Sequence, residues 1–141
     1  MQKAGATGLI PRKKLFGNPT RAQAKISPDG QWLSWLAPRD GVLNICVAPA
    51  GDIQASRFIT NDAKRGIRFH GWALDSSHVL YMQDEGGTEE WHIYAVDVTQ
   101  GTTRDLTPLA GVTAHIHDLV LDHPGAAAIA INDRDKAWHD V

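Results

Sequence analysis

Apolar and aromatic residues alternate with short turn signals along most of the chain, at intervals typical of β-strands. The clearest stretch is 69–107, where three runs rich in apolar residues and a closing segment at 103–107 are separated by turn residues. The turn at 84–88 carries two adjacent glycines that are free to adopt positive φ, as β-hairpins often require. The run at 91–98 is rich in aromatic and β-branched residues. The pattern therefore predicts a four-stranded antiparallel meander.

The same arrangement recurs on both sides of this stretch. The turn aspartates Asp29, Asp75 and Asp122 are separated by 46 and 47 residues, and the closing threonines Thr60 and Thr107 by 47. A four-strand unit repeated at this interval is typical of a β-propeller blade. No window shows the sustained i, i+3, i+4 apolar spacing of a helical repeat. The constant interval also argues against an immunoglobulin-like sandwich.

We therefore predict an all-β chain that forms a partial β-propeller, with two complete four-stranded blades and a truncated third. The propeller fragment is expected over 23–141, with blades at about 23–60, 67–108 and 114–141. Residues 1–22 are expected to form an extended N-terminal arm whose apolar pairs pack against another part of the protein. Propellers typically close with about four to eight blades, so the chain resembles the N-terminal piece of a longer protein.

Composition narrows the classes of function. A formal net charge of −2 gives no field that would attract nucleic acid or an anionic membrane, so neither is expected as a partner. The longest apolar run, 126–131, is far too short to cross a bilayer. Cys46 is the single cysteine, so no internal disulfide can form, and its aliphatic neighbours indicate packing. Four tryptophans are expected in the core between blades, namely Trp32, Trp35, Trp72 and Trp91.

The N-terminus lacks the apolar segment of a signal peptide. The cytoplasm is therefore the default location, and a periplasmic location would need a signal that had been removed from the chain.

Candidate chemistry is sparse. No serine stands in the Gly-x-Ser-x-Gly sequence of a nucleophile elbow, so no catalytic residue is predicted in this chain. No phosphate-binding glycine loop is present, and no cofactor is expected. His115 and His117 alternate on a predicted strand and share a face near Asp118. Two imidazoles alone do not make a metal site, so no metal is predicted.

Several motifs, taken in order, resemble the prolyl oligopeptidase family of serine peptidases, and in particular its bacterial acylaminoacyl- and dipeptidyl-peptidase-like members. The motifs are Leu9-Ile10-Pro11-Arg12, Leu15-Phe16-Gly17-Asn18-Pro19, Ile26-Ser27-Pro28-Asp29-Gly30, Tyr81-Met82-Gln83-Asp84, Glu90-Trp91-His92-Ile93-Tyr94-Ala95-Val96-Asp97, Asp105-Leu106-Thr107-Pro108 and Asn132-Asp133-Arg134-Asp135. The resemblance implies an N-terminal propeller that caps an active site and limits substrate size. It also implies a partner, the C-terminal α/β-hydrolase domain that holds the catalytic serine, aspartate and histidine. This chain lacks that domain and is expected to be non-catalytic by itself.

Three residues are candidate substrate contacts. The resemblance implies such a role for Glu89 and Glu90, because some relatives use a glutamate pair on a propeller loop to hold the free amine of a peptide substrate. Carboxylates suit that role through charge-assisted hydrogen bonds, although the local motif differs from that branch and a solvated hairpin tip is the alternative. Arg134, between Asp133 and Asp135, would either reach the cleft between the two domains or make local turn contacts.

A second function stays open, that of a stand-alone propeller-type module that binds a protein or peptide without enzymatic activity. A reading frame that continues into further blades and then Gly-x-Ser-x-Gly would favour the peptidase; a natural stop would favour the module. An incomplete ring leaves the outer face of a terminal blade uncovered, so self-association or poor folding is also expected.

Overall fold

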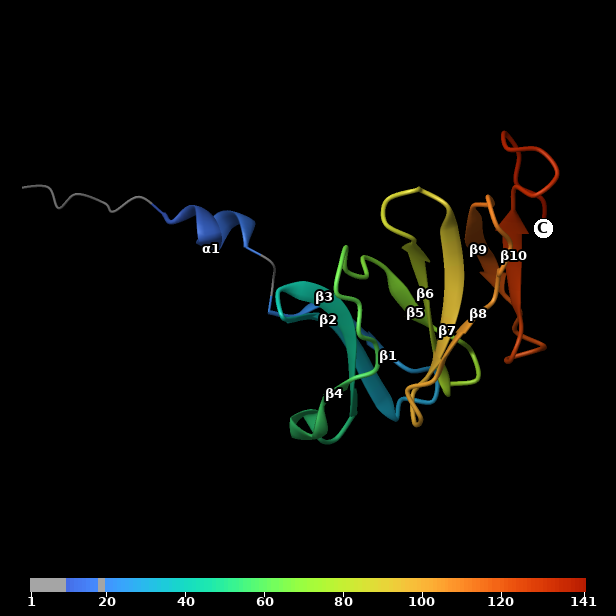
Figure 1. The fold of residues 1–141 in the computed structure, drawn as a ribbon. Coiled ribbons are helices and arrows are strands. Elements are labelled where there is room, and N and C mark those ends of the chain that lie inside the picture. Colours follow the sequence, from blue (N-terminus) through green and yellow to red (C-terminus); the bar gives the residue numbers. More distant parts are fainter. Residues whose placement is uncertain (1–9, 18–19) are drawn as a thin grey trace, which may run out of the picture.

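The computed structural model describes residues 10–17 and 20–141, and nearly all of its regular structure is β-strand (Figure 1). Two four-stranded antiparallel sheets come first, each a meander in which every strand pairs with the next along the chain. The first sheet contains β1 (Ala22–Ile26), β2 (Trp32–Arg39), β3 (Val42–Pro49) and β4 (Arg57–Phe58). The second contains β5 (His70–Trp72), β6 (His78–Asp84), β7 (Trp91–Asp97) and β8 (Thr103–Asp105).

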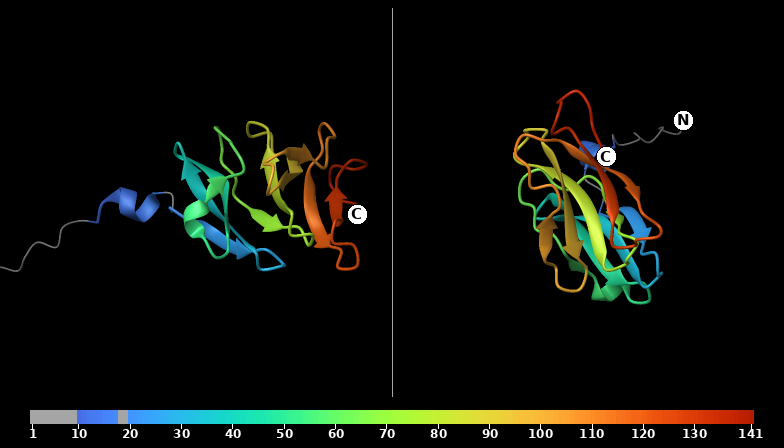
Figure 2. Two further views of the ribbon diagram at one scale, coloured as in Figure 1. Left: turned by 90° about the horizontal axis from the view of Figure 1, so that it is seen from below. Right: turned by 90° about the vertical axis from the view of Figure 1, so that its right-hand side faces the viewer.

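A two-stranded sheet follows, made of β9 (Ala114–Leu119) and β10 (Ala127–Ile131), and Ile131 forms a further bridge with Asp140. The three sheets lie face to face in chain order, as propeller blades do (Figure 2). This arrangement confirms the predicted all-β fold class. No helix in the described part of the chain has the length and apolar character needed to cross a membrane.

The predicted repeat is confirmed by equivalent turns. Asp29 lies between β1 and β2, Asp75 between β5 and β6, and Asp122 between β9 and β10. The closing threonines are equivalent as well. Each hydroxyl accepts a hydrogen bond from a backbone N–H of the third strand of its sheet, at 2.8 Å for Thr60 and 3.0 Å for Thr107.

Local turn chemistry explains where the strands of the first sheet end. The Gly30 N–H donates to the Ser27 carbonyl at 2.9 Å, which closes the turn predicted at Ser27-Pro28-Asp29-Gly30. Asp40 and Gly41 have φ values of 51° and 85°, as a two-residue type I′ hairpin requires between β2 and β3.

The main apolar core lies between the first and second sheets. Its buried members are Leu36, Ile45, Val47, Ile59, Ile67, Trp72, Val79, Tyr81, Val96 and Val98. Because side chains alternate along a strand, Val79 and Tyr81 of β6 enter this core whereas Leu80 faces the third sheet. The cluster between the second and third sheets is smaller: Ala73, Leu80 and Ala95 are buried there, with Leu106, Ile116, Leu119 and Ala127 partly buried.

Polar contacts also cross the interface between the first and second sheets. The hydroxyl of Ser34 lies 3.0 Å from Nε2 of His70, and both residues are buried. Arg57 of β4 donates through Nη2 to the carbonyls of Val98 and Thr99 beyond β7. These contacts join β2 to β5 and β4 to the turn after β7, so they fix the first blade to the second at two places.

The N-terminal arm differs from the prediction. Arg12–Phe16 forms the one-turn helix α1, where an extended segment is predicted. The Lys14 N–H donates to the Pro11 carbonyl at 2.8 Å, and proline followed by good helix formers favours such a start. Ile10 and Phe16 are 62% and 79% exposed in this chain, and the packing of the arm against another part of the protein stays a prediction. The parts of the predicted arm at 1–9 and 18–19 lie outside the described residues.

The predicted role of the tryptophans is only partly right. Trp72 is buried between the first two sheets and Trp32 packs against the same cluster. Trp35 instead lies on the far face of the first sheet, where it clusters with Cys46 and is 4% exposed. Arg21 covers it, with Cζ 5.4 Å from a Trp35 ring centroid. The outer face of the first blade is therefore less open than the uncovered face predicted from the sequence.

Candidate functional site

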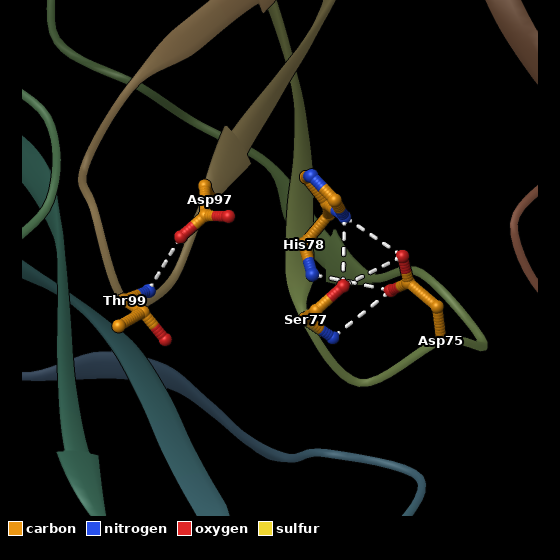
Figure 3. Close-up of polar contacts among 5 residues, drawn as sticks. All are labelled: Asp75, Ser77, His78, Asp97 and Thr99. Carbon is orange, nitrogen blue, oxygen red and sulfur yellow. Dashed lines mark hydrogen bonds and ion pairs between the residues drawn. The ribbon is translucent and has the colours of Figure 1, made fainter.

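A serine, a histidine and an aspartate meet at the turn between β5 and β6 (Figure 3). Oγ of Ser77 lies 2.9 Å from Nδ1 of His78, and Oδ2 of Asp75 lies 2.7 Å from the same nitrogen. In a catalytic triad the serine and the carboxylate contact opposite ring nitrogens, so that the ring can take a proton from the serine. Here both contact Nδ1, and Nε2 points away from them (Figure 3). The arrangement does not activate Ser77.

These contacts close the turn instead. The Asp75 carboxylate accepts hydrogen bonds from the backbone N–H of Ser77 at 2.9 Å and of His78 at 3.1 Å. Burial raises the pKa of Asp75, but the hydrogen bonds from His78 and Ser77 outweigh it and lower the pKa overall. Asp97 caps its turn in the same way, accepting from the Thr99 N–H at 2.7 Å (Figure 3). Both clusters are turn caps at the lower end of the blades in Figure 1.

The hairpin between β6 and β7, at the opposite end of the blade, carries the predicted glutamate pair (Figure 1). Asp84 ends β6, and its buried carboxylate accepts from Arg65 Nη1 at 2.6 Å and from the Glu89 N–H at 3.2 Å. The Glu89 carbonyl accepts from the Thr113 hydroxyl at 2.9 Å. Arg65 lies in the connection before the second sheet and Thr113 in the connection after it. Both connections therefore hold the hairpin in place.

Backbone conformation also marks this hairpin as a specified structure. Glu89 has a φ of 62°, a left-handed conformation that a residue other than glycine keeps only when its surroundings fix it. Gly87 has a φ of 100°, and a Cβ there would lie 3.0 Å from Nη1 of Arg65. The side chains of Glu89 and Glu90 are exposed, and neither makes a hydrogen bond to another described residue. A fixed backbone thus presents two free carboxylates to solvent.

Two hollows lie beside the hairpin and share Glu85 and Tyr94. One, of about 390 Å³, lies against the connection between the first two sheets and includes Asp62, Lys64, Arg65 and Asp84 in its wall. The other, of about 330 Å³, lies on the side of β8, and its wall includes Glu90, His92, Asp105 and Pro108.

Arg134 lies apart from this arrangement. It follows β10, and its guanidinium makes two parallel hydrogen bonds to the Asp140 carboxylate, at 2.8 and 2.6 Å. No contact joins it to Glu89 or Glu90 among the described residues. The pairing of Arg134 with Asp140 is the local turn contact that is the second of the two roles expected for Arg134 from the sequence. Its role in contacting substrate stays a prediction.

The other reactive side chains form no centre. The rings of His115 and His139 have centroids 4.5 Å apart, and burial, followed by the charges of His139 and His117, lowers the pKa of His115. Within 10–17 and 20–141, no group of three or more histidine, cysteine, aspartate or glutamate side chains could hold a metal ion. Cys46 is buried, and burial raises the pKa of its thiol above the usual value, which disfavours the reactive thiolate.

Two residues that position the hairpin, Arg65 and Asp84, are missed by the sequence analysis. The only local signal is Asp84 directly before Glu85-Gly86-Gly87, where an aspartate can accept from the N–H groups of a turn. Its pairing with Arg65, across 19 positions, follows from the packing of one blade on the next.

No profile of a known protein family matches the chain. Two curated relatives match along nearly its whole length. It is 46% identical over 139 residues to dipeptidyl aminopeptidase BIII of Pseudoxanthomonas mexicana, and 24% identical over 145 residues to dipeptidyl peptidase family member 6 of Caenorhabditis elegans. The matches cover 99% and 96% of this chain but only 20% and 19% of the relatives. The chain therefore spans about one fifth of the length of these curated relatives.

Solved structures with the same fold include peptidases and a propeller domain. Pyrococcus horikoshii acylaminoacyl peptidase matches with a TM-score of 0.54 at 14% identity, over 84% of this chain and 22% of its own. Puromycin hydrolase matches with a TM-score of 0.52 at 20% identity, over 79% of this chain and 20% of its own. The β-propeller domain of the trilobed protease from Pyrococcus furiosus matches with a TM-score of 0.50 at 18% identity, over 79% of this chain and 40% of its own.

At these identities the structural matches establish the fold, which is part of a β-propeller. The resemblance found from the sequence motifs, to the propeller region of a prolyl oligopeptidase-family peptidase, is confirmed by the 46% identity to dipeptidyl aminopeptidase BIII.

Proposed function

We propose that the chain forms the N-terminal propeller of a serine peptidase, where it caps an α/β-hydrolase domain and limits the size of the substrates that reach it. The observation that carries this proposal is the 46% identity to dipeptidyl aminopeptidase BIII over 99% of this chain. The hydrolase domain supplies the nucleophile in this scheme, because the Ser77–His78–Asp75 contacts cannot.

Peptide is the proposed substrate, and Glu89 and Glu90 are its proposed contacts. An enzyme that releases dipeptides from the N-terminus must recognise a free ammonium group, and two carboxylates do this by charge-assisted hydrogen bonds. The fixed hairpin backbone supports this role, because a preorganised contact loses less entropy on binding. Arg134 is proposed as a further contact that would have to leave Asp140 to reach a substrate carboxylate or carbonyl.

Labelling with a fluorophosphonate, which reacts with activated serines, tests the proposal. We expect the full-length protein to take up one label per chain and to hydrolyse dipeptidyl substrates. We expect the 141-residue chain, treated in parallel, to do neither. Stoichiometric labelling of the 141-residue chain would reveal a nucleophile within it. A full-length protein that takes no label would point to the stand-alone binding module.

The substrate contact has its own test in the full-length enzyme. Glu89→Gln and Glu90→Gln should each raise KM for a dipeptidyl substrate by about tenfold, because each removes one charged acceptor, while kcat changes less. Asp122→Asn removes the same charge from a turn at the other end of a blade and serves as the control. An unchanged KM in both glutamate variants would remove this pair from the substrate site.

A further inference from the structure

The hollow on the β8 side of the hairpin has two aromatic rings in its wall, those of Tyr94 and His92, and Tyr81 packs against Tyr94 from outside the hollow. The rings of Tyr81 and Tyr94 stack with centroids 5.2 Å apart and planes 18° apart. His92 lies beside Tyr94 on β7, with its ring centroid 6.4 Å from that of Tyr94. Pro108 also lines this cavity, whose volume is about 330 Å³. Stacked rings present negative faces and favour a cation or a planar group beside them.

The charge around this cavity has one sign. Glu85, Glu90 and Asp105 line it, and no lysine or arginine does. Asp105 is occupied, with Oδ2 2.7 Å from Nδ1 of His92 and Oδ1 accepting from a backbone N–H. The carboxylates of Glu85 and Glu90 make no hydrogen bond to any described residue. Two carboxylates that can accept hydrogen bonds therefore remain free in the wall of the cavity.

The negative field reaches the aromatic wall. Burial, followed by the charges of Asp105 and Glu85, raises the pKa of Tyr94 above its usual value. Two cations line the adjoining hollow. Arg65 is paired with Asp84 at 2.6 Å, and among the described residues Lys64 makes no ion pair with Glu85 or Glu90. An incoming cation would find both free carboxylates and the face of a ring.

We propose that this cavity binds the basic side chain of a peptide, an arginine guanidinium or a lysine ammonium, between Glu85, Glu90 and the Tyr94 ring. A guanidinium can lie flat against the ring while its edge donates two parallel hydrogen bonds to a carboxylate. The inference rests on the proposed function only in taking a peptide as the ligand. It concerns a side chain, whereas the contact proposed above concerns the free N-terminal amine.

The two contacts can be separated by the choice of probe. Nα-acetyl-arginine amide has no free α-amine and presents only the guanidinium, and Nα-acetyl-citrulline amide is its uncharged isostere. Glycylglycine amide has a free α-amine and no basic side chain. Each is titrated into the full-length protein and followed by ligand-observed NMR, with the thermal midpoint of every variant measured to verify folding.

We expect the arginine amide to bind at least about tenfold more tightly than the citrulline amide, because the charged donor interacts with free carboxylates. The double variant E85Q/E90Q should remove this preference, and Asp122→Asn should keep it. Tyr94→Phe should also keep it, since the ring face is retained. Equal binding of the arginine and citrulline amides, or an unchanged preference in E85Q/E90Q, would overturn the proposal. Binding of glycylglycine amide alone would also overturn it and would leave the N-terminal amine contact standing.

Discussion

The interface between the first and second sheets and the interface between the second and third are built on the two faces of the same strands, β6 and β7. The first interface buries large aliphatic and aromatic side chains, and the buried polar pair Ser34 and His70 crosses it. The second buries two alanines and Leu80, and a hollow of about 90 Å³ remains beside them. The first sheet has four strands and the third has two, so the second interface is smaller in sheet area as well as in the volume of its side chains.

The candidate binding features, which are the hairpin between β6 and β7 and the hollows beside it, lie at one end of the second blade. This blade contributes to both interfaces. Arg65 comes from the connection across the first interface and Thr113 from the connection across the second, and the two hold the hairpin from opposite sides. A tightly packed first interface gives Arg65 a fixed position. The hairpin geometry therefore depends on blade packing as well as on its own residues.

Shortening a buried side chain by the same number of carbon atoms should destabilise the protein more at the first interface than at the second. Ile45→Ala and Leu80→Ala each remove three carbon atoms, from residues that are 0% and 5% exposed. We expect Ile45→Ala to lower the free energy of unfolding by about 4 kcal/mol and Leu80→Ala by about 2 kcal/mol, because the neighbours of Leu80 are already loosely packed. Urea unfolding followed by tryptophan fluorescence measures both. Equal losses would mean that the two interfaces are packed alike.

Acidification should weaken the first interface through His70. Burial, with a smaller contribution from Lys25, lowers the pKa of His70 to about 4, from 6.5. The unfolded chain therefore binds a proton at higher pH than the folded chain. This contribution to stability is complete above pH 6.5 and falls as the pH drops from 6.5 to 4, by up to about 3 kcal/mol. Urea midpoints at pH 7 and pH 4.5 measure the loss, and His70→Gln should reduce it. If the His70→Gln variant lost as much stability between pH 7 and pH 4.5 as the parent, the loss would come from other titrating groups.

Adjacent glycines in the hairpin should differ in their tolerance of alanine. Both Gly86 and Gly87 have positive φ, so either substitution strains the backbone by about 1 kcal/mol. At Gly87 the new Cβ would also lie 3.0 Å from Arg65 Nη1, whereas nothing lies within 4 Å at Gly86. Arg65 can move aside only by loosening its ion pair with Asp84, so we expect Gly87→Ala to cost about 2 kcal/mol in total. Thermal unfolding compares the two, and equal shifts would show that Arg65 moves freely.

The sequence predicts the fold well because its signals are local. Turn residues such as Asp29, Asp40 and Gly41 act within a few positions, and their regular spacing reveals the repeat. The arm at Arg12–Phe16 is predicted wrongly, because apolar pairs next to prolines are read as an extended segment although the residues between them form helices well.

Only part of the candidate site can be predicted from the sequence. Glu89 and Glu90 stand out as an acidic pair beside a hairpin signal, but the contacts that fix them come from Arg65 and Thr113, each 24 positions from Glu89. Such pairs are set by how one blade packs on the next. The stacking of Tyr81 on Tyr94 is likewise set by strand register, because the two residues are paired across β6 and β7.

The smallest expected effect tests whether the second interface has spare volume. Ala95 and Val96 are neighbours on β7 that face opposite interfaces, and Ala95 borders the hollow of about 90 Å³. Ala95→Val should fill part of this space and suits a β-strand, so we expect stability to rise by up to about 1 kcal/mol. Val96→Ile adds a single methylene to a fully buried position in the first interface and should lower stability by about 1 kcal/mol. Chemical unfolding of both variants against the parent gives the sign of each change. Opposite signs on neighbouring residues would follow from the difference in packing, whereas a loss in both would show that the second interface is as full as the first.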